Sequence, residues 1–139
     1  MNEVNSAKAV LISASGAAGV VFTKIFGSLN DDLLSLILLM IIDFITAFIL
    51  AALFRKSTKT INGGLSSRAC MQGIAKKVAG IMLVAVAYRS EQLLGVDYLR
   101  VAVIWGLCAA EIISILENAG RMGILPKGVQ KTFEKIIDT

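Results

Sequence analysis

Residues 33–54 form an apolar stretch that is interrupted by one charged side chain, Asp43. As an α-helix this stretch would measure about 33 Å, enough to cross the ~30 Å hydrocarbon core of a lipid bilayer. Two acidic residues, 31–32, precede it and two basic residues, 55–56, follow it, so charged groups would lie at both membrane surfaces. The stretch therefore predicts a membrane-spanning helix, and the rest of the chain must fold around that constraint.

Three further apolar segments accompany this helix, at residues 9–26, 78–94 and 99–119. The chain of 139 residues is 56% hydrophobic and its mean hydropathy is +0.77, both high for a soluble domain of this length. We therefore predict an all-α integral membrane protein with one membrane domain, residues 1–139, and four spanning helices. The count falls to three if residues 9–26, whose apolar run between two lysines is short, do not insert.

Small residues at helical spacing indicate close helix packing. Ser15 and Gly19 lie four positions apart, a spacing that lets two helix backbones approach each other in lipid. Their segment is predicted to be either an oligomerisation helix, or one that moves in and out of the bilayer, or a weak spanning helix whose lysines reach the interface. Gly106 is likewise predicted to be a packing position. The tail, residues 121–139, predicts a short amphipathic helix from about residue 127.

Basic residues are concentrated in two blocks. The connector, residues 55–77, holds six cations and no acid: Arg55, Lys56, Lys59, Arg68, Lys76 and Lys77. Arg121 opens the second block, the tail. Loops rich in lysine and arginine remain in the cytoplasm, so we predict that the connector, the tail and, with four spans, both termini are cytoplasmic. The connector is predicted to be either a platform for lipid headgroups or a solvated loop that sets orientation.

The charged turns between spans should face the other side of the membrane. Asp31 and Asp32 form one such turn and Asp97 and Arg100 flank the other, and all are predicted to be solvated. The net charge of +4 does not indicate nucleic-acid binding, because the cations flank apolar runs as the positive-inside rule requires.

Charged and polar side chains also fall inside the predicted spans. Asp43 and Glu111 lie on two spans that run in the same direction, each about 16 Å from the outer boundary. Arg89, on the antiparallel third span, lies about 18 Å from the inner side and is predicted to reach either acid. Polar neighbours at helical spacing complete the set: Thr46, Ser114, Glu117 and Asn118. These groups are predicted either to be neutral and hydrogen-bonded across helices, or to form a polar stripe that lines water when the packing changes.

The residues needed for common catalytic and metal sites are missing from the sequence. It contains no histidine, and its two cysteines, Cys70 and Cys108, lie far apart. No nucleophile–base pair and no glycine-rich phosphate loop is found, so we predict no enzyme activity, no metal and no cofactor.

Three stretches resemble a known family. They are residues 43–47 (DFITA), residues 66–77 of the connector, and residues 111–126, which carry the string SILEN followed by Met122-Gly123 and Pro126. Over roughly residues 35–130 the chain resembles the lysis and toxin-release holins of Gram-positive phages and clostridial toxin loci. Two positions depart from the pattern: Ala47, where glycine is usual, and Arg89, where a neutral or acidic residue is usual.

The resemblance implies a small protein of the bacterial cytoplasmic membrane that forms homo-oligomers and opens lesions. A cytosolic endolysin or a toxin would then cross without necessarily touching it. The intramembrane acids leave two alternatives open: a small proton-coupled transporter or channel that uses Glu111 or Asp43, and an accessory subunit with a purely structural role.

Overall fold

The computed structural model describes residues 2–137, which are helical apart from short connections. The elements are α1 (Asn2–Phe26), α2 (Asp31–Ile49), the π-helical η1 (Leu50–Phe54), α3 (Ser67–Leu94), α4 (Leu99–Met122) and α5 (Lys127–Ile137). Four helical segments, with α2 and η1 counted as one, are long and apolar enough to cross a membrane. The all-α fold with four candidate spans and a short C-terminal helix is thus confirmed; the last two residues of the predicted tail lie outside the described range.

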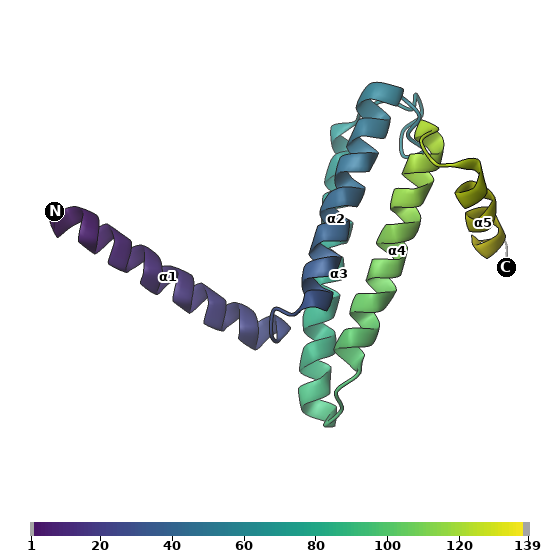
Figure 1. The fold of residues 1–139 in the computed structure, drawn as a ribbon. Helices are drawn as coiled ribbons and strands as arrows, with labels where there is room; N and C mark the ends of the chain where they lie inside the picture. Colours follow the sequence, from purple (N-terminus) through teal and green to yellow (C-terminus); the bar gives the residue numbers. More distant parts are fainter. Residues whose placement is uncertain (1, 138–139) are drawn as a thin grey trace.

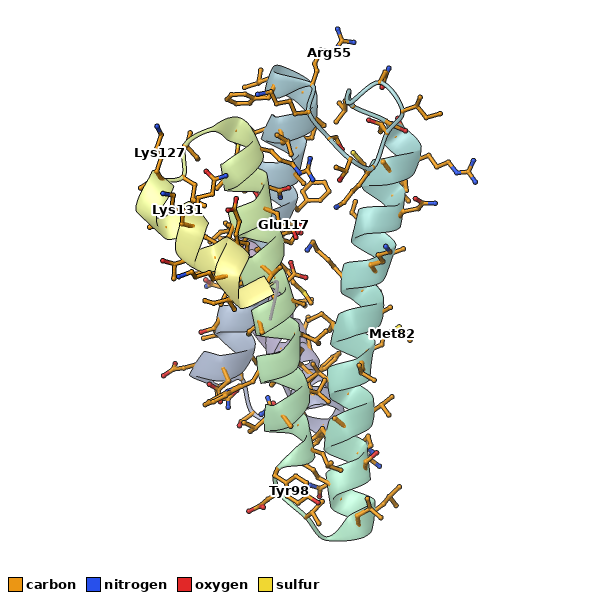
Figure 2. All side chains as sticks on the ribbon, turned by 90° about the vertical axis from the view of Figure 1, so that its right-hand side faces the viewer. Arg55, Met82, Tyr98, Glu117, Lys127 and Lys131 are labelled. Atoms are coloured by element: carbon orange, nitrogen blue, oxygen red, sulfur yellow. The ribbon has the colours of Figure 1, made fainter. Side chains whose placement is uncertain are left out.

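Helices α2, α3 and α4 form a three-helix bundle in which α2 and α4 run parallel and α3 runs antiparallel (Figure 1). We call its two ends the connector end, where Arg55 lies, and the turn end, where Tyr98 lies (Figure 2). Helix α4 packs against both neighbours, whereas α2 and α3 contact each other sparsely.

The apolar core occupies the half of the bundle nearer the turn end. It is formed by five buried side chains: Leu33, Leu36, Met40, Val84 and Ile104. The three residues from α2 recur at three- and four-residue spacing, so they lie on one helix face. Asn30 caps the N-terminus of α2: its side-chain oxygen accepts a hydrogen bond from the Leu33 N–H, at 3.3 Å.

Helix α3 is longer than the span predicted for it at residues 78–94, because it begins at Ser67. Ser66 caps its first turn by accepting a hydrogen bond from the Ala69 N–H. Only residues 55–66 remain as a loop, which we call the connector loop, and Lys76 and Lys77 lie within the helix.

The connector loop is fixed by a close backbone contact. Arg55 ends η1 in the left-handed conformation, with φ at 53°. Gly63 folds back onto it, and a Cβ atom at Gly63 would lie only 2.0 Å from the Arg55 carbonyl oxygen. A side chain is therefore excluded at this glycine, and the loop is held over the connector end of the bundle.

Helix α1 leaves the bundle at a steep angle (Figure 1). None of its described residues is buried, and its contact with the core comes from Phe22 and Phe26 in its last two turns. Gly27, with φ at 80°, makes the turn that follows. Most of the apolar surface of α1 is therefore available to lipid or to another chain.

Helix α5 follows a tight turn after α4. Gly123, with φ at 76°, ends α4, and the Ile124 N–H donates back to the Ala119 carbonyl oxygen. Helix α5 then lies beside the connector-end part of α4 (Figure 2). Its apolar residues Val129 and Phe133 are one helical turn apart, as an amphipathic helix requires.

Candidate functional site

Three charged side chains meet between α2, α3 and α4. The Lys77 Nζ atom lies 2.7 Å from Asp43 Oδ2 and 2.5 Å from Glu111 Oε2. Their side chains retain 18% (Lys77), 7% (Asp43) and 14% (Glu111) of their exposure. We call this group the ion triad; one ammonium group bridges two carboxylates, one from each parallel helix.

The helix register explains why these residues meet. Asp43 lies about 18 Å along α2 from Asp31, and Glu111 lies about 18 Å along α4 from Leu99. Because α2 and α4 run parallel, the two acids reach the same level. Lys77 comes to that level from the opposite direction on α3. The sequence reasoning anticipated that the two acids lie level, and the structure places them there.

A neutral polar layer continues the triad toward the connector end. The Asn118 side-chain amide donates to Asp43 Oδ1, at 3.3 Å, and to Thr46 Oγ1, at 3.1 Å. The Thr46 hydroxyl in turn donates to the Asp43 main-chain carbonyl, at 3.0 Å. Within residues 2–137 no buried side-chain nitrogen or oxygen lacks a hydrogen-bond partner. The buried polar atoms of this half therefore all have partners as long as the three helices stay packed.

Two cavities flank the triad. One, of about 50 Å³, lies under the connector loop; the other, of about 200 Å³, lies mainly between α3 and α4 and also reaches Ser114. Asp43, Lys59 and Lys77 line both of them. Each cavity has room for more than one water molecule and offers polar partners. Among the described residues no group of three or more acids or cysteines is placed to hold a metal ion.

Glycines on α3 shape this region. A Cβ atom at Gly80 would lie 3.2 Å from the Met40 Cε atom, so this glycine leaves room for the end of the Met40 side chain. Gly73 lies seven residues earlier, on the same face of α3. A Cβ atom there would meet no atom within 4 Å, and Gly73 lines both cavities. Closely packed and open regions thus follow each other along one face of α3.

The prediction that Arg89 reaches the acids is wrong. Arg89 is exposed, and both carboxylates are bound by Lys77, which had been assigned only to topology and headgroup contact. The cause is the early start of α3 at Ser67, which carries Lys77 about 15 Å into the helix. No sequence signal pointed to Lys77, because apolar residues lie on all sides of α3 and mark no single face of it.

Arg100 is not a solvated turn residue as predicted; it is 7% exposed. Its guanidinium donates to the carbonyl oxygens of Phe26 and Ser28, both at 2.6 Å, and its main-chain N–H donates to Glu91 Oε1, at 2.7 Å. Glu91 is also buried. Arg100 thereby fastens the end of α1 to the bundle, a role that sequence reasoning missed because the partners lie more than 70 residues away.

The remaining predicted residues do not join the triad. A Cβ atom at Gly19 or Gly106 would meet no atom within 4 Å, and the Ser15 hydroxyl donates only to the Ile12 carbonyl oxygen of its own helix. Glu117 and Arg121 line a pocket between α4 and α5, and no ion pair joins them. Five cations of the connector are exposed, in the connector loop and the first turns of α3: Arg55, Lys56, Lys59, Arg68 and Lys76.

Comparison with known proteins gives one family. A protein of Listeria innocua is 36% identical over 121 residues, covering 86% of this chain and 81% of its own length. A Listeria monocytogenes protein is 35% identical with the same coverage, and one from Halalkalibacterium halodurans is 31% identical over 122 residues, 83% of each chain. All three are described as uncharacterized, and no solved structure matches the chain. The family model described as the bacteriophage holin family matches residues 20–138, so the chain belongs to the bacteriophage holin family.

Proposed function

We propose that this protein is a holin, which forms homo-oligomers in the bacterial cytoplasmic membrane and opens lesions there. A cytosolic endolysin, or a toxin without a signal peptide, would cross through the lesion. Membership of the holin family and four helices of spanning length support this proposal. The observation that carries it is the ion triad, because it places three charged groups between α2, α3 and α4, where the packing of these helices shields most of their surface.

The energetics favour a two-state assembly. A lysine or aspartate at the centre of a spanning helix costs about 2.5 to 3.5 kcal/mol on insertion scales. The triad offsets that cost by mutual pairing and by the Asn118 hydrogen bonds. If α2 and α4 separate from α3, the same groups must be covered by water. A packed state, in which the triad is paired, and an open state, in which water covers its groups, are thus both available. Oligomerisation at rising concentration would shift the balance between them.

Exposed helix surfaces outside the bundle core support the proposed oligomerisation. No described residue of α1 is buried, and the small residues Ser15 and Gly19 are exposed on it. A Cβ atom at Gly19 would meet no atom within 4 Å. Gly106 presents a similar open position on α4. Small residues of this kind let helices of neighbouring chains approach closely in lipid.

A proton-coupled transporter is the alternative function. Such a protein needs a carboxylate that binds and releases its proton during transport. Here both carboxylates are bound to the same ammonium group inside the bundle. That pairing favours a role in holding the helices together over a role in binding and releasing protons.

Inducible expression in a bacterium tests the proposal, with and without a cytosolic endolysin, while turbidity and membrane potential are followed. We expect a delay, then an abrupt loss of membrane potential, and lysis only when the endolysin is present. Lys77→Met should shift the onset of this loss, whereas Lys76→Met, an equal charge change at an exposed neighbour, should not. Continued growth with intact potential at high expression would reject the holin and favour the transporter.

A further inference from the structure

An apolar groove runs between α2 and α3, on the face of the bundle where these two helices contact each other sparsely. Its volume is about 490 Å³. Side chains from both helices line it: Ile37, Ile41 and Phe44 from α2, and Ile74, Val78 and Met82 from α3. Four of these six are exposed by 42% or more, so the groove is open to its surroundings. In a membrane those surroundings are lipid tails.

The groove continues at the connector end into the smaller cavity under the connector loop. Phe44 and Lys77 line both spaces, so the two adjoin. Most of the cavity wall is also apolar, but it carries polar groups that the groove does not expose. Its lining includes the hydroxyl groups of Thr60 and Ser66 and the side chain of Lys59.

Positive charges outnumber negative ones at the connector end. The ion triad carries one net negative charge, because Lys77 is bound to both Asp43 and Glu111, and Lys59 balances it. The excess positive charge comes from four other exposed cations of the connector: Arg55, Lys56, Arg68 and Lys76. Lys59 makes no ion pair within the described part of the chain, and it reaches the cavity from the connector loop. The N-terminus of α3, capped by Ser66, points to the same place and adds a partial positive charge. An anionic group would therefore be attracted here, next to an apolar groove.

We propose that this face binds an anionic phospholipid of the leaflet at the connector end. The phosphate lies beside Lys59 under the connector loop, and one acyl chain fills the groove between α2 and α3. A free phosphate would use the polar end only and would leave the apolar groove without a role. The adjacency of a basic polar end and an apolar groove, aligned along the helices as a lipid lies in a bilayer, selects a lipid. This proposal rests on membrane residence alone and does not depend on holin activity.

The lipid's contribution would be to fill the weakest interface of the bundle. Contacts of α2 with α3 are few, and the triad lies just behind the groove at Lys77. The bound acyl chain would cover Lys77 from the lipid side. The lipid phosphate would add a contact to the connector loop, which the contact of Gly63 with Arg55 already holds over the bundle. The packed state of the bundle would thus depend on the lipid composition of the leaflet.

Lipid binding to the full chain in detergent micelles tests the proposal, by native mass spectrometry with phosphatidylglycerol or phosphatidylcholine. We expect phosphatidylglycerol to bind about fivefold more tightly, the contribution of about one lysine near a headgroup. Lys59→Gln should abolish that preference, and Lys56→Gln, an equal charge change on an exposed neighbour outside the cavity, should keep it. Val78→Phe should weaken the binding of both lipids, because the larger side chain fills the groove. Val86→Phe, the same change at an exposed site of α3 outside the groove, should leave the binding unchanged.

Several results would overturn the proposal. Equal effects of Lys59→Gln and Lys56→Gln would mean diffuse attraction without a site. Displacement of phosphatidylglycerol by inorganic phosphate at an equal concentration would mean that the acyl chain contributes nothing. Helix α1 is the competing occupant, since Phe26 lines the groove. A disulfide between Ala17→Cys and Val78→Cys, in a chain whose native cysteines are replaced by serine, would show that α1 fills the groove instead.

Discussion

Removing the cation of the ion triad should be the most informative perturbation of this protein. Lys77→Met shortens the side chain by one atom, removes its charge and leaves two carboxylates next to each other between α2 and α4. Breaking a buried ion pair by removing one partner costs about 3 to 5 kcal/mol. Since the Lys77 side chain is 18% exposed and two cavities adjoin it, we take the lower value, about 3 kcal/mol. That value corresponds to about a hundredfold shift toward the separated helices.

The assay is unfolding of the full chain by SDS in mixed micelles, followed by the fluorescence of Trp105 on α4. The triple variant Lys77→Met, Asp43→Asn, Glu111→Gln removes every charge of the triad and should restore stability to within about 1 kcal/mol, because neutral replacement of a buried ion group is nearly neutral. Lys76→Met serves as the charge-matched control. If Lys76→Met destabilised the chain equally, the loss would not be specific to the triad. If the triple variant showed no recovery, the loss would not come from the two carboxylates left without their cation.

Three further variants test other parts of the structure. Asn118→Ala removes two hydrogen bonds from the polar layer and should cost about 1 to 3 kcal/mol in the same unfolding assay, while leaving helix content unchanged. Arg100→Gln should free the end of α1, and a spin label on α1 should then show increased mobility. Arg100→Lys should not restore the order, because one ammonium group cannot reproduce the planar guanidinium that donates to two carbonyl oxygens. Gly80→Val should cost about 1 to 3 kcal/mol by pushing α3 away from Met40, whereas Gly73→Ala, which has open space, should be tolerated.

The sequence predicted the helices well because bilayer thickness imposes their length and because apolar runs bounded by charges are easily recognised. It also placed the two acids at one level, since rise per residue is constant along parallel helices. The identity of their cation was missed for two reasons. Charged residues were taken as the boundary of the third span, although α3 continues through them. Apolar residues are also spread around all sides of α3, so no periodicity showed that Lys77 rather than Arg89 faces the acids.

The burial of Arg100 was beyond sequence reasoning for a different reason. Its partners are main-chain carbonyl oxygens at the end of α1, and every residue type supplies such an oxygen. Only the angle at which α1 leaves the bundle decides that these oxygens face Arg100. Long-range contacts with the backbone therefore leave no signature in a single sequence.

The distribution of apolar and polar residues along the bundle bears on where a lesion would form. At the turn end, buried side chains such as Leu36, Val84 and Ile104 fill the space between the three helices. That half offers no path for water, so one bundle cannot by itself be the pore. At the connector end the triad and its cavities already provide polar walls. A lesion of the proposed kind must therefore open between chains. We expect it to start at the connector end, where separating α3 from α2 and α4 exposes charged groups that water stabilises.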